Sequence, residues 1–162
     1  MQKLLVAAFW LCLLSLPITV AAASAEGRPI EGHQNLRLGM TLAEAEAAEP
    51  RAQPDGNCPD GTCLGYFDRR FLSTGYQVLA VFGADDSLHS IALSMLMAQG
   101  EASCRRQLGT AARDFTRSYG APDSTADGIS TWHDSTAAIV LTDGCAAAGG
   151  STIAITINSQ PR

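Results

Sequence analysis

Strict alternation of apolar with small or polar side chains in two segments is the feature of this sequence that most constrains its fold. The apolar members are Ile91, Leu93, Met95 and Met97 in segment 88–97, and Ile153, Ile155 and Ile157 in segment 151–158. Alternation with period two puts one set of side chains on one face of a strand. The sequence therefore predicts a sheet with one buried face.

The remaining segments predict the order helix, three strands, helix, three strands. Thr41-Leu42-Ala43-Glu44 forms a capping box, so a short helix is expected from there to about Glu49, where Pro50 stops it. A longer helix is expected over 101–119, because apolar residues follow one helical stripe and Gly120 and Pro122 end it. The expected strands are 64–72, 76–82, 88–97, 129–134, 137–142 and 151–158.

This order indicates an α+β fold, an antiparallel sheet with helices packed on one face. Leu38-Gly39 and Leu108-Gly109 each lie near an expected helix, and similar blocks of strands follow them. We interpret residues 26–162 as a single α+β domain built from two tandem helix-plus-three-strand repeats, 36–98 and 101–158.

The first 25 residues have the three parts of a secretory signal. Lys3 supplies the positive charge, residues 4–16 are apolar, and Ala23-Ser24-Ala25 is a small-residue cleavage site. An uncleaved anchor is the alternative, since residues 4–23 nearly reach membrane-spanning length, although Pro17 interrupts them. We expect residues 1–25 to be a signal peptide, no stable membrane span after its cleavage, and a periplasmic or secreted protein.

Four cysteines remain once Cys12 is removed with the expected signal: Cys58, Cys63, Cys104 and Cys145. An even number in an exported chain predicts a disulfide framework, and four cysteines allow three pairings. Pro59 and Gly61 can close a tight loop between Cys58 and Cys63, which favours that pair and leaves Cys104 with Cys145. The C-x-x-C spacing of zinc and redox sites does not occur here.

Two segments resemble motifs of known families. The segment Leu38-Gly39-Met40-Thr41-Leu42-Ala43-Glu44-Ala45 resembles the start of the helix in small outer-membrane-assembly lipoproteins (SmpA/OmlA-like) and in the repeats of β-lactamase inhibitory proteins. The segment ending in Tyr119-Gly120-Ala121-Pro122 is similar to the Gly-x-Pro helix end of those families. The resemblance implies helices packed on an antiparallel sheet and a role in binding proteins. The first helix ends in Ala48-Glu49-Pro50 instead, and the lipidation cysteine is missing.

The sequence carries few signs of catalysis. His33, His89 and His133 lack the spacing of a metal site and are interpreted as surface or capping residues, so no metal or other cofactor is expected. A segment beginning at Asp55 departs from a calcium loop, with Tyr66 at its twelfth position. No serine elbow, P-loop, dinucleotide fingerprint or HExxH motif occurs. A non-enzymatic protein is therefore expected.

An aromatic and arginine-rich segment is the best sequence candidate for a binding surface. Period two places Tyr66, Asp68 and Arg70 on one face and Phe67 and Phe71 on the other. With the two phenylalanines assigned to the core, Tyr66 and Arg70 are expected to be exposed and to contact a partner, because Tyr and Arg are enriched at interface hot spots. Trp132 is expected in the core.

The leading hypothesis is a protein-binding adaptor or inhibitor of the bacterial envelope. Its partner is expected to be another envelope or secreted protein. The net charge of −5 argues against a general nucleic-acid partner, and the near-exclusive use of arginine over lysine is typical of GC-rich bacterial genomes. A small secreted hydrolase or small-ligand carrier is the alternative.

Overall fold

The structure, a computed structural model, describes residues 27–56, 58, 61–71, 75–97, 100–146 and 151–160. The expected signal peptide, residues 1–25, lies outside these residues. The elements run in the order β1 (Gly32–His33), β2 (Leu36–Arg37), α1 (Leu42–Ala48), β3 (Gln53–Pro54), β4 (Thr62–Asp68), β5 (Tyr76–Phe82), β6 (Leu88–Met97), α2 (Glu101–Tyr119), β7 (Ser124–Ala126), β8 (Ile129–His133), β9 (Ala137–Gly144) and β10 (Ser151–Ser159).

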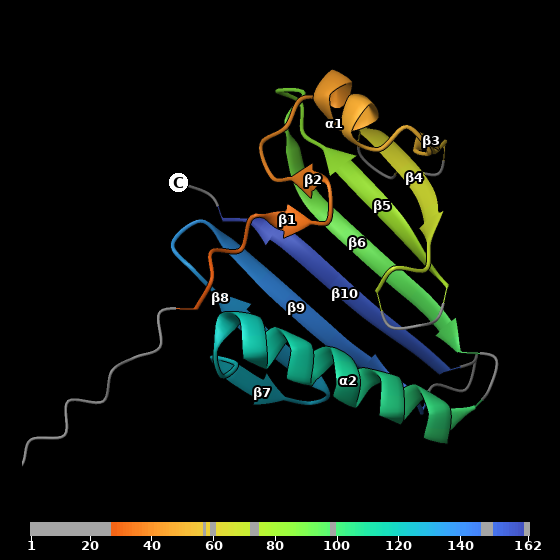
Figure 1. The fold of residues 1–162 in the computed structure, drawn as a ribbon, viewed down its shortest axis with the longest axis vertical. Helices are drawn as coiled ribbons and strands as arrows, with labels where there is room; N and C mark the ends of the chain where they lie inside the picture. Colours follow the sequence, from red (N-terminus) through yellow and green to blue (C-terminus); the bar gives the residue numbers. More distant parts are fainter. Residues whose placement is uncertain are drawn as a thin grey trace, which may run out of the picture.

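Eight antiparallel strands form the main sheet in the order β3-β4-β5-β6-β10-β9-β8-β7. This order consists of two meanders that meet at β6 and β10, which lie side by side in the middle of the sheet (Figure 1). Their register pairs Met95 with Ile153 and Leu93 with Ile155. The expected α+β class and antiparallel sheet are thus confirmed, and each half has a helix followed by four strands where three were expected.

One face of the sheet carries the hydrophobic core. Its buried strand residues include Val78, Ala80, Phe82, Ile91, Leu93, Met95, Ile139, Leu141, Ile153, Ile155 and Ile157. Helix α2 packs on β6, β9 and β10, in front of the sheet in Figure 1, and Ala45 of α1 belongs to the same core as Ala111 of α2. Burying each such Ile or Leu contributes about 1.5–3 kcal/mol. Trp132 is also buried, as expected.

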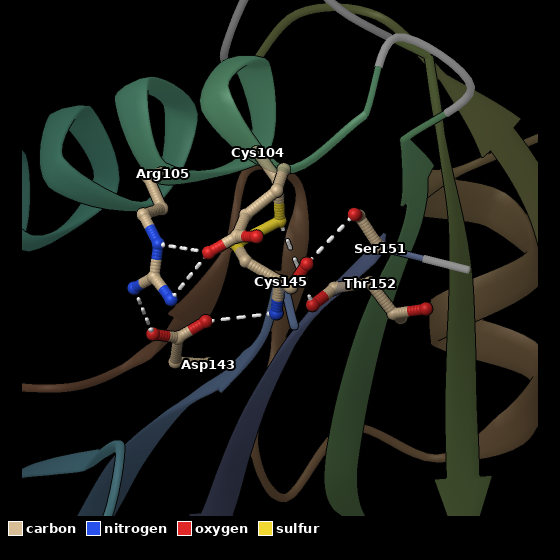
Figure 2. The surroundings of a disulfide bond; sticks show 7 residues. Cys104, Arg105, Asp143, Cys145, Ser151 and Thr152 are labelled. Atoms are coloured by element: carbon tan, nitrogen blue, oxygen red, sulfur yellow. Dashed lines mark hydrogen bonds and ion pairs between the residues drawn. A yellow bond between two sulfur atoms is a disulfide. The ribbon is translucent and has the colours of Figure 1, made fainter. Parts of the chain in front are cut away.

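The start of α2 is attached to the sheet by the disulfide Cys104–Cys145, whose Cα atoms lie 5.5 Å apart. Figure 2 shows Asp143 beside it: one carboxylate oxygen accepts from the Cys145 amide at 2.8 Å and the other pairs with Arg105 at 3.2 Å. The Ser151 hydroxyl donates to the Cys145 carbonyl at 2.8 Å. Helix, turn and strand are therefore joined at one point.

The second disulfide joins Cys58 to Cys63 with a Cα separation of 5.7 Å. Both favoured pairings are confirmed. The capping box of α1 is confirmed too: the Glu44 amide donates to Thr41 Oγ1 at 3.3 Å, and the Glu44 carboxylate accepts from the Thr41 amide at 2.8 Å.

The segment before α1 consists of residues 27–31, called here the strap, and a short two-stranded ribbon. The Arg28 amide donates to the Ser118 carbonyl at 3.0 Å, and the Ile30 amide donates to Asp134 Oδ2 at 2.6 Å. Strands β1 and β2 then pair as a two-stranded ribbon with Gln34 in the left-handed region at φ 54°. The buried Ile30 side chain fastens the strap to the body of the protein.

Further differences from the expected elements concern short or terminal segments. Strands β7 and β3 lie where no strand was expected. Strand β4 ends at Asp68, earlier than the expected residue 72. Strands of two or three residues are too short to show a period, so the sequence pattern could not reveal them.

Candidate functional site

The outward side of the four central strands, called here the uncovered face, is a candidate surface. It consists of Gln77, Leu79 and Val81 on β5, Ser90, Ala92 and Ser94 on β6, Thr152, Ala154, Thr156 and Asn158 on β10, and Ala138, Val140 and Thr142 on β9. All of these side chains are half-buried or exposed, and none is charged. In an antiparallel sheet with one solvated face, the side chains on that face are polar. The cores of protein interfaces differ from ordinary solvated surfaces in having few charged residues.

The large exposed hydrophobic side chains of the described chain, Phe67 (61% exposed) and Ile129 (41%), both border this face. Phe67 on β4 pairs with Gln77, and Ile129 on β8 pairs with Thr142, so each points to the same side as its partner. A Cβ on Gly75 would come within 2.5 Å of the Phe67 ring, which shows how closely the ring lies over that glycine. The uncovered face is thus uncharged and has an exposed hydrophobic side chain at each flank.

The expected exposure of Tyr66 is wrong. Its side chain points into the core and is 7% exposed, while Phe67 points out. The alternation along β4 was identified correctly, but the inward face was assigned to the wrong residues. The reason is that Asp68, which shares a face with Tyr66, can be buried because two arginines neutralise it.

Glu49, Arg51, Asp68 and Arg70 form an ion-pair cluster at the end of β4. Arg51 pairs with Glu49 at 2.7 Å and with Asp68 at 3.0 Å; Arg70 pairs with Glu49 at 2.9 Å and with Asp68 at 2.6 Å. Both carboxylates are buried and both guanidinium groups are half-exposed. Hydrogen bonds from Arg70 hold the pKa of Asp68 well below its usual range, and the pKa of Glu49 is lowered chiefly by Arg51.

Tyr66 lies beneath this cluster, with the Arg51 guanidinium 5.2 Å from its ring centroid. Burial, reinforced by the charge of Glu49, raises the pKa of the Tyr66 hydroxyl. The hydroxyl has no hydrogen-bond partner among the described residues. The buried Tyr66 ring therefore packs against the core side of the ion-pair cluster, whereas the Arg70 side chain remains half-exposed.

A cleft of about 520 Å³, called here the arm–helix cleft, is lined by residues of the strap, of the ribbon and of α2. Arg28, Arg37 and Arg70 line it together with the aromatic residues Phe71, Phe115 and Tyr119. Phe115 and Tyr119 do not stand out in the sequence as part of a site, because they also fit the apolar stripe of an ordinary helix. Only the folding of the strap over α2 brings them beside Arg28.

The histidines lie apart. His33 is half-buried and packs edge-on against Phe71 and Tyr76, with ring centroids 6.0 and 5.9 Å away, so it is more enclosed than the expected surface position. His89 and His133 are exposed. Within the described ranges, no group of three or more His, Cys, Asp or Glu side chains is placed to hold a metal ion.

The two disulfides indicate a protein of an oxidising compartment. Among the described residues, no helix is long and apolar enough to cross a membrane. Comparison of the chain with protein-family models, with curated proteins and with solved structures finds no match.

Proposed function

We propose that this protein is an exported, non-enzymatic domain of the bacterial envelope that binds another protein through the uncovered face. One observation carries the proposal: a sheet face without a charged side chain has the exposed hydrophobic residues Phe67 and Ile129 at its flanks. A face without charged side chains has the charge depletion that is typical of interface cores. Phe67 is the expected anchor, since large aromatic side chains dominate interface energetics.

Two further features support this function. The disulfides stabilise the sheet against the conditions outside the cytoplasm. The helix start at Leu38–Ala45 and the helix end at Tyr119–Pro122 resemble those of the SmpA/OmlA-like lipoproteins and the β-lactamase inhibitory proteins. This resemblance implies a role in binding proteins. The partner is an envelope or secreted protein that presents a largely apolar, uncharged surface.

A matched pair of substitutions tests the surface. Thr156, paired with Ala92 and Val140, lies at the centre of the uncovered face, whereas Thr116 is exposed on α2. The disulfide-intact protein and its Thr156→Arg and Thr116→Arg variants would be used as bait on crosslinked envelopes, with captured proteins identified by mass spectrometry. We expect wild type and Thr116→Arg to capture the same partner and Thr156→Arg to lose it by about tenfold or more, about 1.4 kcal/mol.

Phe67→Ala provides an independent check, because removing an exposed ring should cost little folding stability but weaken the complex. A partner that Thr156→Arg captures as well as wild type does would exclude the uncovered face. If no protein is enriched above a tag-only control, protein binding itself is the wrong function, and a small-ligand carrier takes its place.

A further inference from the structure

We propose that the arm–helix cleft binds a small organic anion with an aromatic body, independently of the protein-binding face. The cleft lies on the helix-bearing side of the sheet, so its occupant does not contact the uncovered face. Its volume of about 520 Å³ falls within the range of small-molecule sites, roughly 300–1,000 Å³.

Arg28 supplies the charge for the anion. Of the other arginines in the cleft, Arg37 lies 3.6 Å from Glu31, and Arg70 is held by Asp68 and Glu49. Arg28 makes no ion pair with any described residue, and its side chain is exposed. A guanidinium group can form two parallel hydrogen bonds with one carboxylate, which makes it well suited to this anion.

The acidic residues of the cleft leave this charge available. Glu31 already faces Arg37, and Asp114 pairs with Arg117 at 3.1 Å. His33 adds no positive charge at neutral pH, because burial lowers its pKa to about 4. The anionic group of the ligand is therefore directed to Arg28, at the end of the cleft where the strap joins α2.

Aromatic side chains form the apolar wall for the body of the ligand. The ring centroids of Phe71 and Phe115 lie 5.8 Å apart, and those of Phe115 and Tyr119 lie 6.2 Å apart. All of these rings are half-buried, so each keeps a surface open to the cleft. The hydrogen bond from the Arg28 amide to the Ser118 carbonyl, 3.0 Å, holds Arg28 beside this wall.

One guanidinium without an ion-pair partner and a row of aromatic rings in the same cleft point to an aromatic monocarboxylate as the ligand class. An aromatic cation would be repelled by the like charge of Arg28, and a neutral ring would gain no charge attraction from it. A ligand with several negative charges would gain little additional affinity, because Arg37 and Arg70 are already paired with acidic residues of the protein.

The test compares 2-naphthoate with its neutral isostere 2-naphthamide by calorimetry and by amide NMR shifts on the full disulfide-bonded protein. We expect saturable binding of 2-naphthoate at millimolar concentrations or below, shifts confined to residues 28–37, 70–71 and the second half of α2, and affinity for 2-naphthamide at least about tenfold weaker. Arg28→Gln should reduce naphthoate affinity by about tenfold, and Arg106→Gln, on the exposed side of α2, should leave it unchanged.

Equal affinity for the acid and the amide, an unchanged affinity in Arg28→Gln, shifts outside the cleft, or no saturable binding would each overturn the proposal. The Thr156→Arg variant should bind 2-naphthoate like wild type, since Thr156 lies on the opposite side of the sheet. Naphthoate binding that is lost in this variant would also overturn it, because the two sites would then not be separate.

Discussion

His33 acquires its acid–base behaviour from residues far away in the sequence. Its ring lies edge-on to Phe71 and Tyr76, and its Nε2 is 3.3 Å from the Tyr76 hydroxyl. Burial is the largest cause that lowers its pKa from 6.5 to about 4; Arg70 adds to this effect and Asp68 opposes it. The folded protein therefore prefers the neutral imidazole.

This preference predicts a loss of stability in mild acid. Below pH 6.5 the unfolded chain binds a proton at His33, whereas the folded chain binds it only near pH 4, so the free energy of unfolding should fall as the pH drops through this interval. The ring is partly solvated, so we expect a fall on the order of 2 kcal/mol. Urea unfolding at several pH values between 7 and 4 would measure it.

The His33→Gln variant should lose this pH dependence, and His89→Gln, which alters an exposed histidine, should keep it. An equal slope in wild type and His33→Gln would show that other groups cause the acid sensitivity.

At the scale of elements, α2 depends on the disulfide at its first turn. The N-cap residue Gly100 has no side chain to cap the helix, so the bond from Cys104 to Cys145 and the ion pair between Arg105 and Asp143 attach this end (Figure 2). The other end is held by packing: Phe115 contacts Trp132 with ring centroids 5.4 Å apart, and the Trp132 indole donates to the Gly120 carbonyl at 3.1 Å.

The two disulfides should contribute unequally to stability. They close loops of different length, with sequence separations of 41 for Cys104–Cys145 and 5 for Cys58–Cys63. Loop-closure entropy predicts a loss of about 4 kcal/mol for the Cys104→Ser/Cys145→Ser variant and about 2 kcal/mol for Cys58→Ser/Cys63→Ser. Denaturant unfolding of both double variants measures the difference, and a larger loss from the second pair would contradict the expected order.

For the whole molecule, the meeting of β6 with β10 joins the two halves of the chain. Isoleucine and leucine side chains from both strands face each other on the core side, and α2 packs over them. The short strands β3 and β7 lie at the two edges of the sheet. The central strands are therefore expected to be the most stable part of the fold, and the edge strands the least stable.

Hydrogen exchange should show this gradient. We expect the slowest amides in β6 and β10, opening only with global unfolding, and exchange faster by orders of magnitude in β3 and β7. Mass spectrometry or NMR of the exchanging protein would record it. If one half of the sheet lost protection before the other, as a block that includes its central strand, the two halves would be separate folding units.

The sequence by itself determined the longer elements, which show a clear hydrophobic period, and the two disulfides. Strand β5 and helix α2 have the predicted bounds, the loop residues Pro59 and Gly61 favoured the Cys58–Cys63 pair, and Cys104–Cys145 followed as the remaining pair. Local periodicity, capping and turn residues are sufficient for such elements, because their signals lie within a few residues of one another.

The tertiary structure alone decided which residues form a site. Alternation showed that Tyr66 and Phe67 point to opposite faces, but only the approach of Arg51 and Arg70 to Asp68 made the Tyr66 face the inner one. In the same way, Arg28 lies beside the aromatic wall of α2 only because the strap docks there. The pairing of Arg51 with Asp68, 17 residues apart, and the docking of the strap on α2 join segments that are distant in the sequence, so no local pattern could reveal them.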